Sequence, residues 1–522
     1  MSKESKEYAV KIAQESGAKE IEILKIRPYV KPQDYCFRVF ECELEAVLKK
    51  LQDEGYLGKK CLFVTSPSAL RAASSKFSNN DYYYACVTDT KADNLMRFVN
   101  ECTDEGYAKT KEQMQALADS LQAEADVLQI LYAMNERELH TDPMNLSQQL
   151  DELAGKIANS TDKYVLNQKI VSSDIDTVIA LGGGVAMDAG QYLATHLGKQ
   201  WKKELRFICI PTVLSVNAAF CYKAAMRIRD ASGKYEVKYD STLVQPDILL
   251  MDSSIILTAG DRNVDGAGDL ISCLTASFDW KLNSLIARDY QPKGKDVSKP
   301  FNQEICTGTM ELIGLLAERI EDLNAMREYA KLLTELGHTS PPNEEQLQVK
   351  KAAEAGLHFI CEAYHWLAEQ SWIMQHTMWE SASEHGMFDT MEYVCGTEFN
   401  HGRIIGLCVY FMSLLQDNEH ERAVSMIKRL KLDITLNNMA KDNSKVTPEK
   451  LVECLQTAKE YLTGESYRYT IISAKEMTDE WIYEAVKKYS EDFPKDPAGK
   501  ANKDFTDVLR RLKGKISQER GG

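Results

Sequence analysis

Three segments in the second half of the chain carry side chains that bind divalent metal ions. Asp269 ends the motif GAGD, His385 ends ESASEH, and His401 is the middle residue of NHG. One carboxylate and two imidazoles leave a coordination position open for substrate or water, which is typical of catalytic rather than structural zinc sites. The spacing alone is weak evidence, because the chain has nine histidines and several of the others fit packing or surface roles on expected helices. The pattern predicts a catalytic metal site, with plain packing roles as the alternative.

A second candidate site is the run of three glycines Gly182, Gly183 and Gly184. An apolar run typical of a buried strand precedes it at residues 176–181, and apolar residues recur at helical spacing over 185–194. Glycine lets the backbone approach a phosphate closely, and the N-terminus of a helix offers unpaired N–H groups. The turn therefore predicts a phosphate-binding loop, with a glycine turn that serves only packing as the alternative. It lacks the dinucleotide fingerprint G-x-G-x-x-G, so an ordinary Rossmann enzyme is not indicated.

These residues need a sheet and a set of helices to position them. Short apolar runs predict strands at residues 60–65, 82–88, 176–181, 206–210 and 247–251. Helical patterns between the strands indicate parallel βαβ construction, and the polar segment 91–169 is interpreted as a helical insertion. From residue 261 onward apolar positions recur at intervals of three and four. We expect an α/β nucleotide-binding domain with a parallel sheet over 1–260 and an all-α domain for metal and substrate over 261–522, with partial disorder near the end of the tail.

Composition limits the partners of the protein. The 522 residues carry a formal net charge of −15, which argues against nucleic acid or an anionic membrane as the main partner. The 13 cysteines include no C-x-x-C pair, so neither a disulfide framework nor a zinc ribbon is indicated, and a cytoplasmic location is expected. The N-terminus lacks the apolar core of a signal peptide, and polar residues interrupt the most apolar stretch, so no membrane span is expected.

Six motifs follow one another in a characteristic order. The glycine turn is followed by IPTVLS (210–215), GAGDLISCLTASFDWKL (266–282), ESASEH, NHG and YRYTII (467–472). This order resembles the glycerol-1-phosphate dehydrogenase family, and most of all its bacterial branch. The family lies within the class of iron- or zinc-dependent alcohol dehydrogenases and dehydroquinate synthase-like enzymes. The resemblance extends over about residues 20–475 and leaves out the insertion and the tail after 475.

The resemblance implies a site for NAD or NADP and one for a divalent metal. The nicotinamide cofactor would lie along Gly182, Gly183, Gly184, Val185, Thr212, Ser215 and Cys221. Asp269, His385 and His401 would hold the metal and carry catalysis, and Asp269 would also lie beside the substrate. Zinc is favoured, with iron and nickel left open.

The substrate-binding residues depart from the family pattern. Asn217 stands where the family usually has an aspartate that contacts substrate, and Asp389 stands where a histidine is common. Cys221 replaces a serine expected near the nicotinamide. These departures are expected to change which hydroxyl or phosphate pattern the site accepts.

The implied function is a metal-dependent, NAD(P)-linked oxidoreductase that reduces a small ketose phosphate such as dihydroxyacetone phosphate. A cyclase of the dehydroquinate synthase type would use the same cofactor and metal, but its lysine-containing glycine segment is not found after Pro211. A binding protein that retains this scaffold without catalysis is the third hypothesis, and the intact metal ligands weigh against it. NAD against NADP, the exact substrate and the oligomeric state, including a homo-oligomer, stay open.

Overall fold

A computed structural model describes most of the chain outside the expected insertion. It describes residues 3–27, 38–58, 60–73, 76, 83–87, 89–101, 175–286, 299–336, 343–465 and 469–521. Of the insertion expected over 91–169, only the beginning is described, and it contains helix α4 (Ala92–Glu101). The remainder of that insertion lies outside the described residues.

Among the described residues, seven strands form one sheet in the order β1-β2-β9-β6-β5-β3-β4. They are β1 (Lys19–Glu20), β2 (Val39–Glu41), β3 (Lys60–Thr65), β4 (Tyr83–Cys86), β5 (Ile175–Gly182), β6 (Arg206–Pro211) and β9 (Ile248–Met251). All neighbours pair in parallel except β1 and β2. The expected strands and their parallel arrangement are confirmed. Because parallel strands end at the same edge, the turns after β3, β5 and β6 lie side by side.

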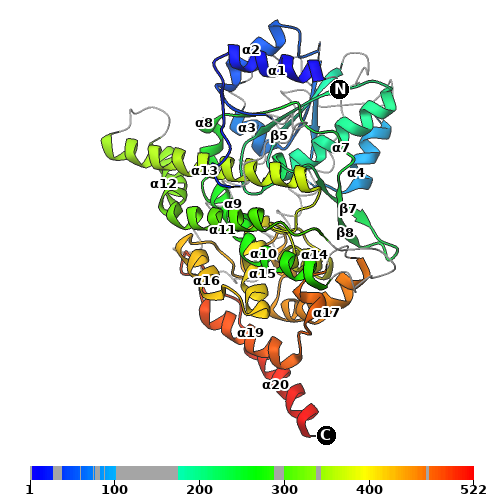
Figure 1. Ribbon diagram of the computed structural model, residues 1–522, viewed down its shortest axis with the longest axis vertical. Coiled ribbons are helices and arrows are strands. Elements are labelled where there is room, and N and C mark those ends of the chain that lie inside the picture. Colours follow the sequence, from blue (N-terminus) through cyan, green and yellow to red (C-terminus); the bar gives the residue numbers. More distant parts are fainter. Residues whose placement is uncertain are drawn as a thin grey trace, which may run out of the picture.

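Both faces of the central strand β5 are buried, which explains its continuous apolar sequence. Val178 and Ala180 pack with one group of helices, and Ile179 and Leu181 pack with another. The first group includes α4 and α7 (Gly184–Trp201); the second is α1 (Lys3–Glu15), α2 (Leu44–Asp53) and α3 (Pro67–Ala73). Figure 1 shows helices on both sides of β5.

A second, two-stranded element follows the sheet strand β6. The 3-10 helix η3 (Asn217–Ala219) leads into an antiparallel hairpin of β7 (Ala224–Arg229) and β8 (Tyr235–Asp240). In Figure 1 the hairpin extends at the right, between α7 and α14. It therefore joins the side of the sheet to the helices below it.

The chain changes from sheet to helices between Met251 and Asp261. Two short elements, α8 (Ser253–Ile256) and η4 (Leu257–Ala259), make the transition. The helices that follow are α9 (Asp261–Ile271), α10 (Cys273–Ile286), α11 (Gln303–Glu318), α12 (Ile320–Leu336), α13 (Glu344–Met374), α14 (Ser383–Cys395), α15 (His401–Gln416), α16 (His420–Arg429), η8 (Asn443–Lys445), α17 (Pro448–Glu465), α18 (Ile471–Ala474), α19 (Asp479–Asp492) and α20 (Thr506–Gly521). The fold class, a sheet part with a glycine turn followed by a helix-rich part, is confirmed. The division into two domains at residue 260 stays a prediction.

The end of the tail is ordered, so the expected partial disorder was wrong. Helix α20 packs on α19 through Val508, Leu512 and Ile516, which are buried and spaced by four residues. An ion pair between Lys515 and Asp479 joins the two helices. The abundant lysines hide this narrow apolar stripe in the sequence. Figure 1 shows α20 extending beyond the remaining helices.

Candidate functional site

A cavity of about 700 Å³ lies between the carboxyl ends of the parallel strands and the helical part. Its walls include Ser66 after β3, Gly183 after β5 and Thr212 after β6. The opposite wall includes Asp269 and both histidines of the predicted metal site. This is the edge of a parallel sheet at which ligands usually bind.

The three predicted metal ligands come together although they lie on three different helices. Asp269 is in α9, His385 in the first turn of α14, and His401 is the first residue of α15. Asp269 Oδ1 lies 3.5 Å from Nε2 of His385 and 3.2 Å from Nε2 of His401. One ligand atom from each residue lies within 4.8 Å of the others, so the donor set fits a divalent cation. That the site binds a metal stays a prediction.

A second carboxylate orients one of the imidazoles. His385 Nδ1 lies 2.9 Å from Oε1 of Glu384, and it donates there because a carboxylate only accepts. Glu384 is itself fixed, since Thr275 Oγ1 and the Ala382 N–H donate to its carboxylate at 2.9 Å and 2.6 Å. This bond leaves the Nε2 lone pair of His385 for a cation, as is usual for metal-binding histidines.

The electrostatics of the centre favour positive charge beside Asp269. Burial alone would raise the pKa of Asp269, but the charge of His401 and the hydrogen bond from His385 hold it below its usual range. Burial disfavours the imidazolium of His385, yet the bonds to Asp269 and Glu384 raise its pKa to about 9. A buried site that keeps Asp269 ionised and stabilises positive charge beside it suits a bound cation.

Close backbone contacts bring α9 and α15 together. A Cβ added to Gly268 would lie 2.3 Å from the carbonyl oxygen of Gly402, and one added to Gly402 would lie 1.7 Å from that of Asp265. A Cβ on Gly266 would lie 2.1 Å from the carbonyl oxygen of Leu214. Gly268 and Gly402 are therefore needed where the two helices touch, which places Asp269 beside His401, whereas Gly266 is needed where α9 touches the segment of Leu214.

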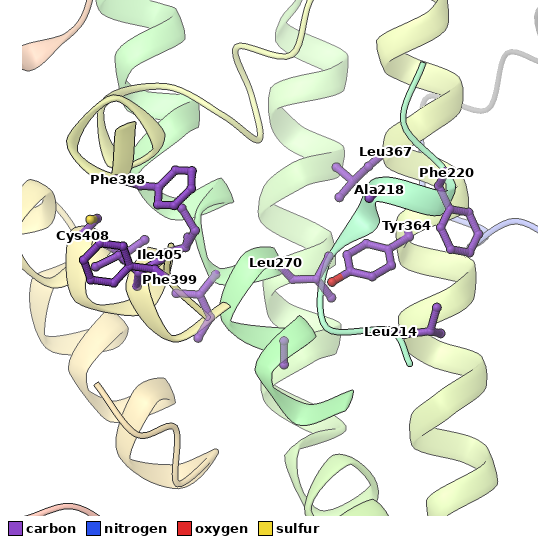
Figure 2. Packing of buried hydrophobic residues seen from close by; sticks show 14 of the residues in the cluster. Leu214, Ala218, Phe220, Leu270, Tyr364, Leu367, Phe388, Phe399, Ile405 and Cys408 are labelled. Carbon is purple, nitrogen blue, oxygen red and sulfur yellow. The ribbon is translucent and has the colours of Figure 1, made fainter. Parts of the chain in front are cut away.

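Apolar side chains pack on both sides of Leu270, the residue that follows Asp269. Figure 2 shows Leu214, Ala218, Phe220, Tyr364 and Leu367 on one side of Leu270, and Phe388, Phe399, Ile405 and Cys408 on the other. The Tyr364 hydroxyl donates to the carbonyl of Gly266 at 2.9 Å, and Phe388 meets the ring of His401 edge-on. This packing restricts the rotation of α9 and the motion of His401.

The glycine turn lies where the sequence predicts it, and packing explains part of its composition. Gly183 and Gly184 line the cavity with Val185, whereas Gly182 is not in the wall. Gly182 has φ 153, a conformation that side chains disfavour. Added Cβ atoms on Gly183 and Gly184 would lie 2.9 Å and 2.8 Å from methyl groups of Val213 and Val216. Phosphate binding stays a prediction, because close packing requires the same glycines.

The other predicted cofactor residues also reach the cavity. Thr212, Ser215 and Cys221 line it, and the Thr212 N–H donates to the carbonyl of Gly182 at 2.9 Å. Burial raises the pKa of the Cys221 thiol well above its usual value, so the thiol is neutral. It offers a weaker hydrogen-bond donor than the serine it replaces.

The two altered substrate residues have separate partners. The Asn217 amide donates to Glu380 Oε2 at 3.4 Å, and its backbone N–H donates to Asp269 Oδ2 at 3.4 Å. Asp389 accepts from the Tyr239 hydroxyl at 3.4 Å and is not in the cavity wall. An aspartate at position 217 would face the carboxylate of Glu380, which explains why an amide suits this place.

Several charged residues of the cavity wall have no role in the sequence prediction, and three of them have informative surroundings. Arg227 on β7 donates to Glu392 on α14 at 3.0 and 2.7 Å, and so ties the hairpin to the helix that carries His385. Asp188 on α7 is buried, and burial raises its pKa to about 7. Glu380 stands in the motif ESASEH, but only the folded chain shows that it meets Asn217.

The comparisons with known proteins agree with the motifs. Residues 158–253 match the family model for iron-containing alcohol dehydrogenases. This is the wider class that the sequence resembles.

The similar relatives include glycerol-1-phosphate dehydrogenases. The enzyme of Methanococcus aeolicus is 30% identical over 165 residues, 31% of this chain and 40% of that protein. The enzyme of Thermococcus kodakarensis is 24% identical over 321 residues, 61% of this chain and 76% of that protein. A 3-dehydroquinate synthase of Lactococcus lactis subsp. cremoris is 33% identical over 118 residues, 23% of this chain and 31% of that protein.

The resemblance to the glycerol-1-phosphate dehydrogenase family is therefore confirmed, at low sequence identity. The chain spans about two fifths of the length of the first of these relatives. Among the described helices, none is both long and apolar enough to cross a membrane.

Proposed function

We propose that this protein is a metal-dependent, NAD(P)-linked oxidoreductase that interconverts a carbonyl and a hydroxyl on a small phosphorylated substrate such as dihydroxyacetone phosphate. The observation that carries the proposal is the meeting of Asp269, His385 and His401 in the cavity that begins at the glycine turn. A single cavity thus includes candidate sites for the cation, the cofactor and the substrate.

The residues of the chain have separable tasks in this reaction. Asp269 and the two imidazoles would hold the cation, and Glu384 keeps His385 oriented toward it. Gly183, Gly184 and the segment from Thr212 to Cys221 would hold the nicotinamide cofactor. A bound divalent cation supplies a Lewis acid that polarises a carbonyl, and the nicotinamide supplies the hydride.

The wall of the cavity carries basic side chains as well as carboxylates, and the basic side chains could bind the phosphate of a substrate. Lys223, Arg227, Arg262 and Lys441 line it. Arg227 forms an ion pair with Glu392, and Lys441 forms one with Glu398, so the positive charges of these two residues are partly neutralised. Basic groups within a cavity attract a phosphate locally whatever the net charge of the surface.

The proposal is tested with the purified protein incubated with zinc, iron or nickel. Dihydroxyacetone phosphate and other ketose phosphates are mixed with NADH or NADPH, and the loss of absorbance of the reduced nicotinamide is followed. Metal-dependent oxidation of one of the two cofactors is expected. No turnover with any phosphorylated ketone, together with phosphate release from a sugar phosphate, would instead favour a cyclase.

A further inference from the structure

The cavity contains a buried carboxylate, Glu380, that neither holds the predicted cation nor orients its ligands. Glu380 lies between α13 and α14, lines the cavity and is 5% exposed. Ser272 Oγ donates to its carbonyl oxygen at 2.6 Å, and Ser371 Oγ donates to its Oε1 at 2.6 Å. Backbone and side chain are thus both held, so the carboxylate has a defined position.

Glu380 is one residue away from the candidate metal centre. Asn217 joins the two, since its backbone N–H donates to Asp269 Oδ2 and its side-chain amide to Glu380 Oε2, each at 3.4 Å. A substrate whose reacting oxygen binds a cation held by Asp269 would therefore point the group attached to its reacting carbon toward Asn217 and Glu380.

The bond from Asn217 to Oε2 is long for an N–H···O bond, which is usually about 2.9–3.0 Å. A substrate hydroxyl that donates to Oε2 replaces a long bond with a short, charge-assisted one. A methyl group at the same place leaves the carboxylate without that bond, and an anionic group meets like charge in a buried site. Glu380 can thus distinguish three kinds of substituent.

We propose that Glu380 is a specificity-determining residue that binds a hydroxyl group beside the reacting carbon and excludes an anion from that position. This inference rests on the proposed function, and it names the substrate class of the same site. In this arrangement a phosphate on the substrate would lie on the other side of its carbonyl.

Three ketones that differ only in this substituent test the inference by binding. Dihydroxyacetone phosphate carries a hydroxymethyl group, hydroxyacetone phosphate a methyl group and 3-phosphohydroxypyruvate a carboxylate. Each is titrated calorimetrically into the zinc-incubated protein with NAD+, which cannot reduce a ketone. The unmodified protein should bind the first at least roughly tenfold more tightly than the second, as expected for a hydrogen bond to a charged group, and should bind the third most weakly.

Two variants of Glu380 separate the effect of its negative charge from the effect of its side-chain size. In Glu380→Gln the preference for the hydroxyl should fall to within about threefold, and the affinity for 3-phosphohydroxypyruvate should rise at least roughly tenfold, since the repulsion is gone. Glu380→Asp keeps the charge and should still exclude the carboxylate. Glu362→Gln, on α13 outside the cavity wall, is the matched control and should bind as the unmodified protein does.

Melting temperature and zinc content are measured for each variant. If Glu380→Gln does not fold, the relative affinities of the three ketones for the unmodified protein and for Glu380→Asp decide whether Glu380 has this role. Equal binding of the three ketones, binding of none, or an unchanged pattern in a folded Glu380→Gln would overturn the role of Glu380. If the protein discriminates among the three ketones in binding but reduces none of them with NADH or NADPH, the proposed oxidoreductase is rejected and the role of Glu380 stands. If it reduces the ketones but binds all three equally, the role of Glu380 is rejected and the oxidoreductase stands.

Discussion

The glycine turn after β5 and the contact between α9 and α15 both depend on glycine, but the neighbours of the two differ. At the turn, added Cβ atoms on Gly183 and Gly184 would meet the methyl groups of valine side chains. At the helix contact, added Cβ atoms on Gly268 and Gly402 would meet carbonyl oxygens of the backbone. Side chains can change rotamer, whereas a helix backbone moves only as a unit. The turn should therefore tolerate substitution better than the centre.

The largest effect is expected when a metal ligand at the centre is removed. His385→Ala should lower zinc affinity by at least roughly 100-fold, because even supporting residues are worth about 10–100-fold, and turnover should fall to background. Zinc content after dialysis and the circular dichroism melting curve are the measurements. His196→Ala, on α7 outside the cavity wall, is the control. A folded His385→Ala variant with full zinc content would remove His385 from the ligand set.

The helix contact is tested by adding one methyl group. Gly268→Ala places a Cβ 2.3 Å from the Gly402 carbonyl oxygen and should lower the free energy of unfolding by about 1–3 kcal/mol or more. Zinc affinity should fall with it, since α9 carries Asp269. Gly314→Ala in α11 has nothing within 4 Å and should be neutral or stabilising by up to about 1 kcal/mol. Urea unfolding measures the free energy of unfolding of both variants. Equal values for Gly268→Ala and Gly314→Ala would contradict the close contact between α9 and α15.

The bond that orients His385 should matter less than the ligand itself. Glu384→Gln keeps the size of the side chain but removes the charge beside Nδ1, so zinc affinity should fall by roughly 10–100-fold. Competition with a chelating dye measures the change. A variant with unaltered affinity would show that His385 is held by packing alone.

The turn needs a double variant, because Gly183→Ala also disturbs Val213. Val213→Ala removes the methyl group that the new Cβ would meet at 2.9 Å. Gly183→Ala/Val213→Ala should therefore recover the melting temperature of Val213→Ala, yet bind NAD(H) or NADP(H) roughly tenfold more weakly if the backbone at Gly183 contacts the cofactor. Fluorescence titration of the reduced cofactor measures this. Full affinity in the double variant would mean that the glycine serves packing alone.

The smallest effect concerns a contact between the two parts of the chain. His358 Nε2 on α13 lies 3.1 Å from Glu41 Oε2 on β2, and this bond raises the pKa of His358 and lowers that of Glu41 to about 2. The contribution of His358 is complete below its unfolded pKa near 6.5 and is lost as the pH rises through the folded value. The contribution of Glu41 to stability is complete above about pH 4.5 and is lost as the pH falls toward 2.

The pair should therefore stabilise most between about pH 4.5 and 6.5, by less than about 1 kcal/mol because both side chains are partly exposed. Urea unfolding of the unmodified protein and of His358→Gln at pH 5.5 and 8.5 checks it. The difference between the two proteins should be larger at pH 5.5. A difference that does not change with pH would indicate that His358 contributes packing only.

Local patterns and tertiary contacts were not equally accessible from the sequence. The strands were predictable because β5 and its neighbours are buried on both faces and read as continuous apolar runs. The predicted metal ligands were assigned from their motifs and from the family resemblance, and two glycines in those motifs, Gly268 and Gly402, are those that the helix contact requires.

Contacts between distant segments left no such signal. The bond between Asn217 and Glu380 spans 163 residues, and neither residue type indicates the other. The hairpin contact of Arg227 with Glu392 spans 165 residues. Helix α20 was missed for another reason, since its buried residues are few among many charged ones. Motifs within single segments, together with the family resemblance, thus indicated the candidate site, and only the packed chain shows that Asn217 meets Glu380.

The order in which the ribosome makes this chain adds a constraint on the metal centre. Asp269 and His401 are separated by 132 residues, with His385 between them. Strand β5, its glycine turn and α7 are complete by residue 201. A nascent chain can therefore assemble much of the sheet long before it possesses the third ligand. The complete set of predicted metal ligands exists only after residue 401 has been added, so this centre is among the last parts of the cavity to be finished.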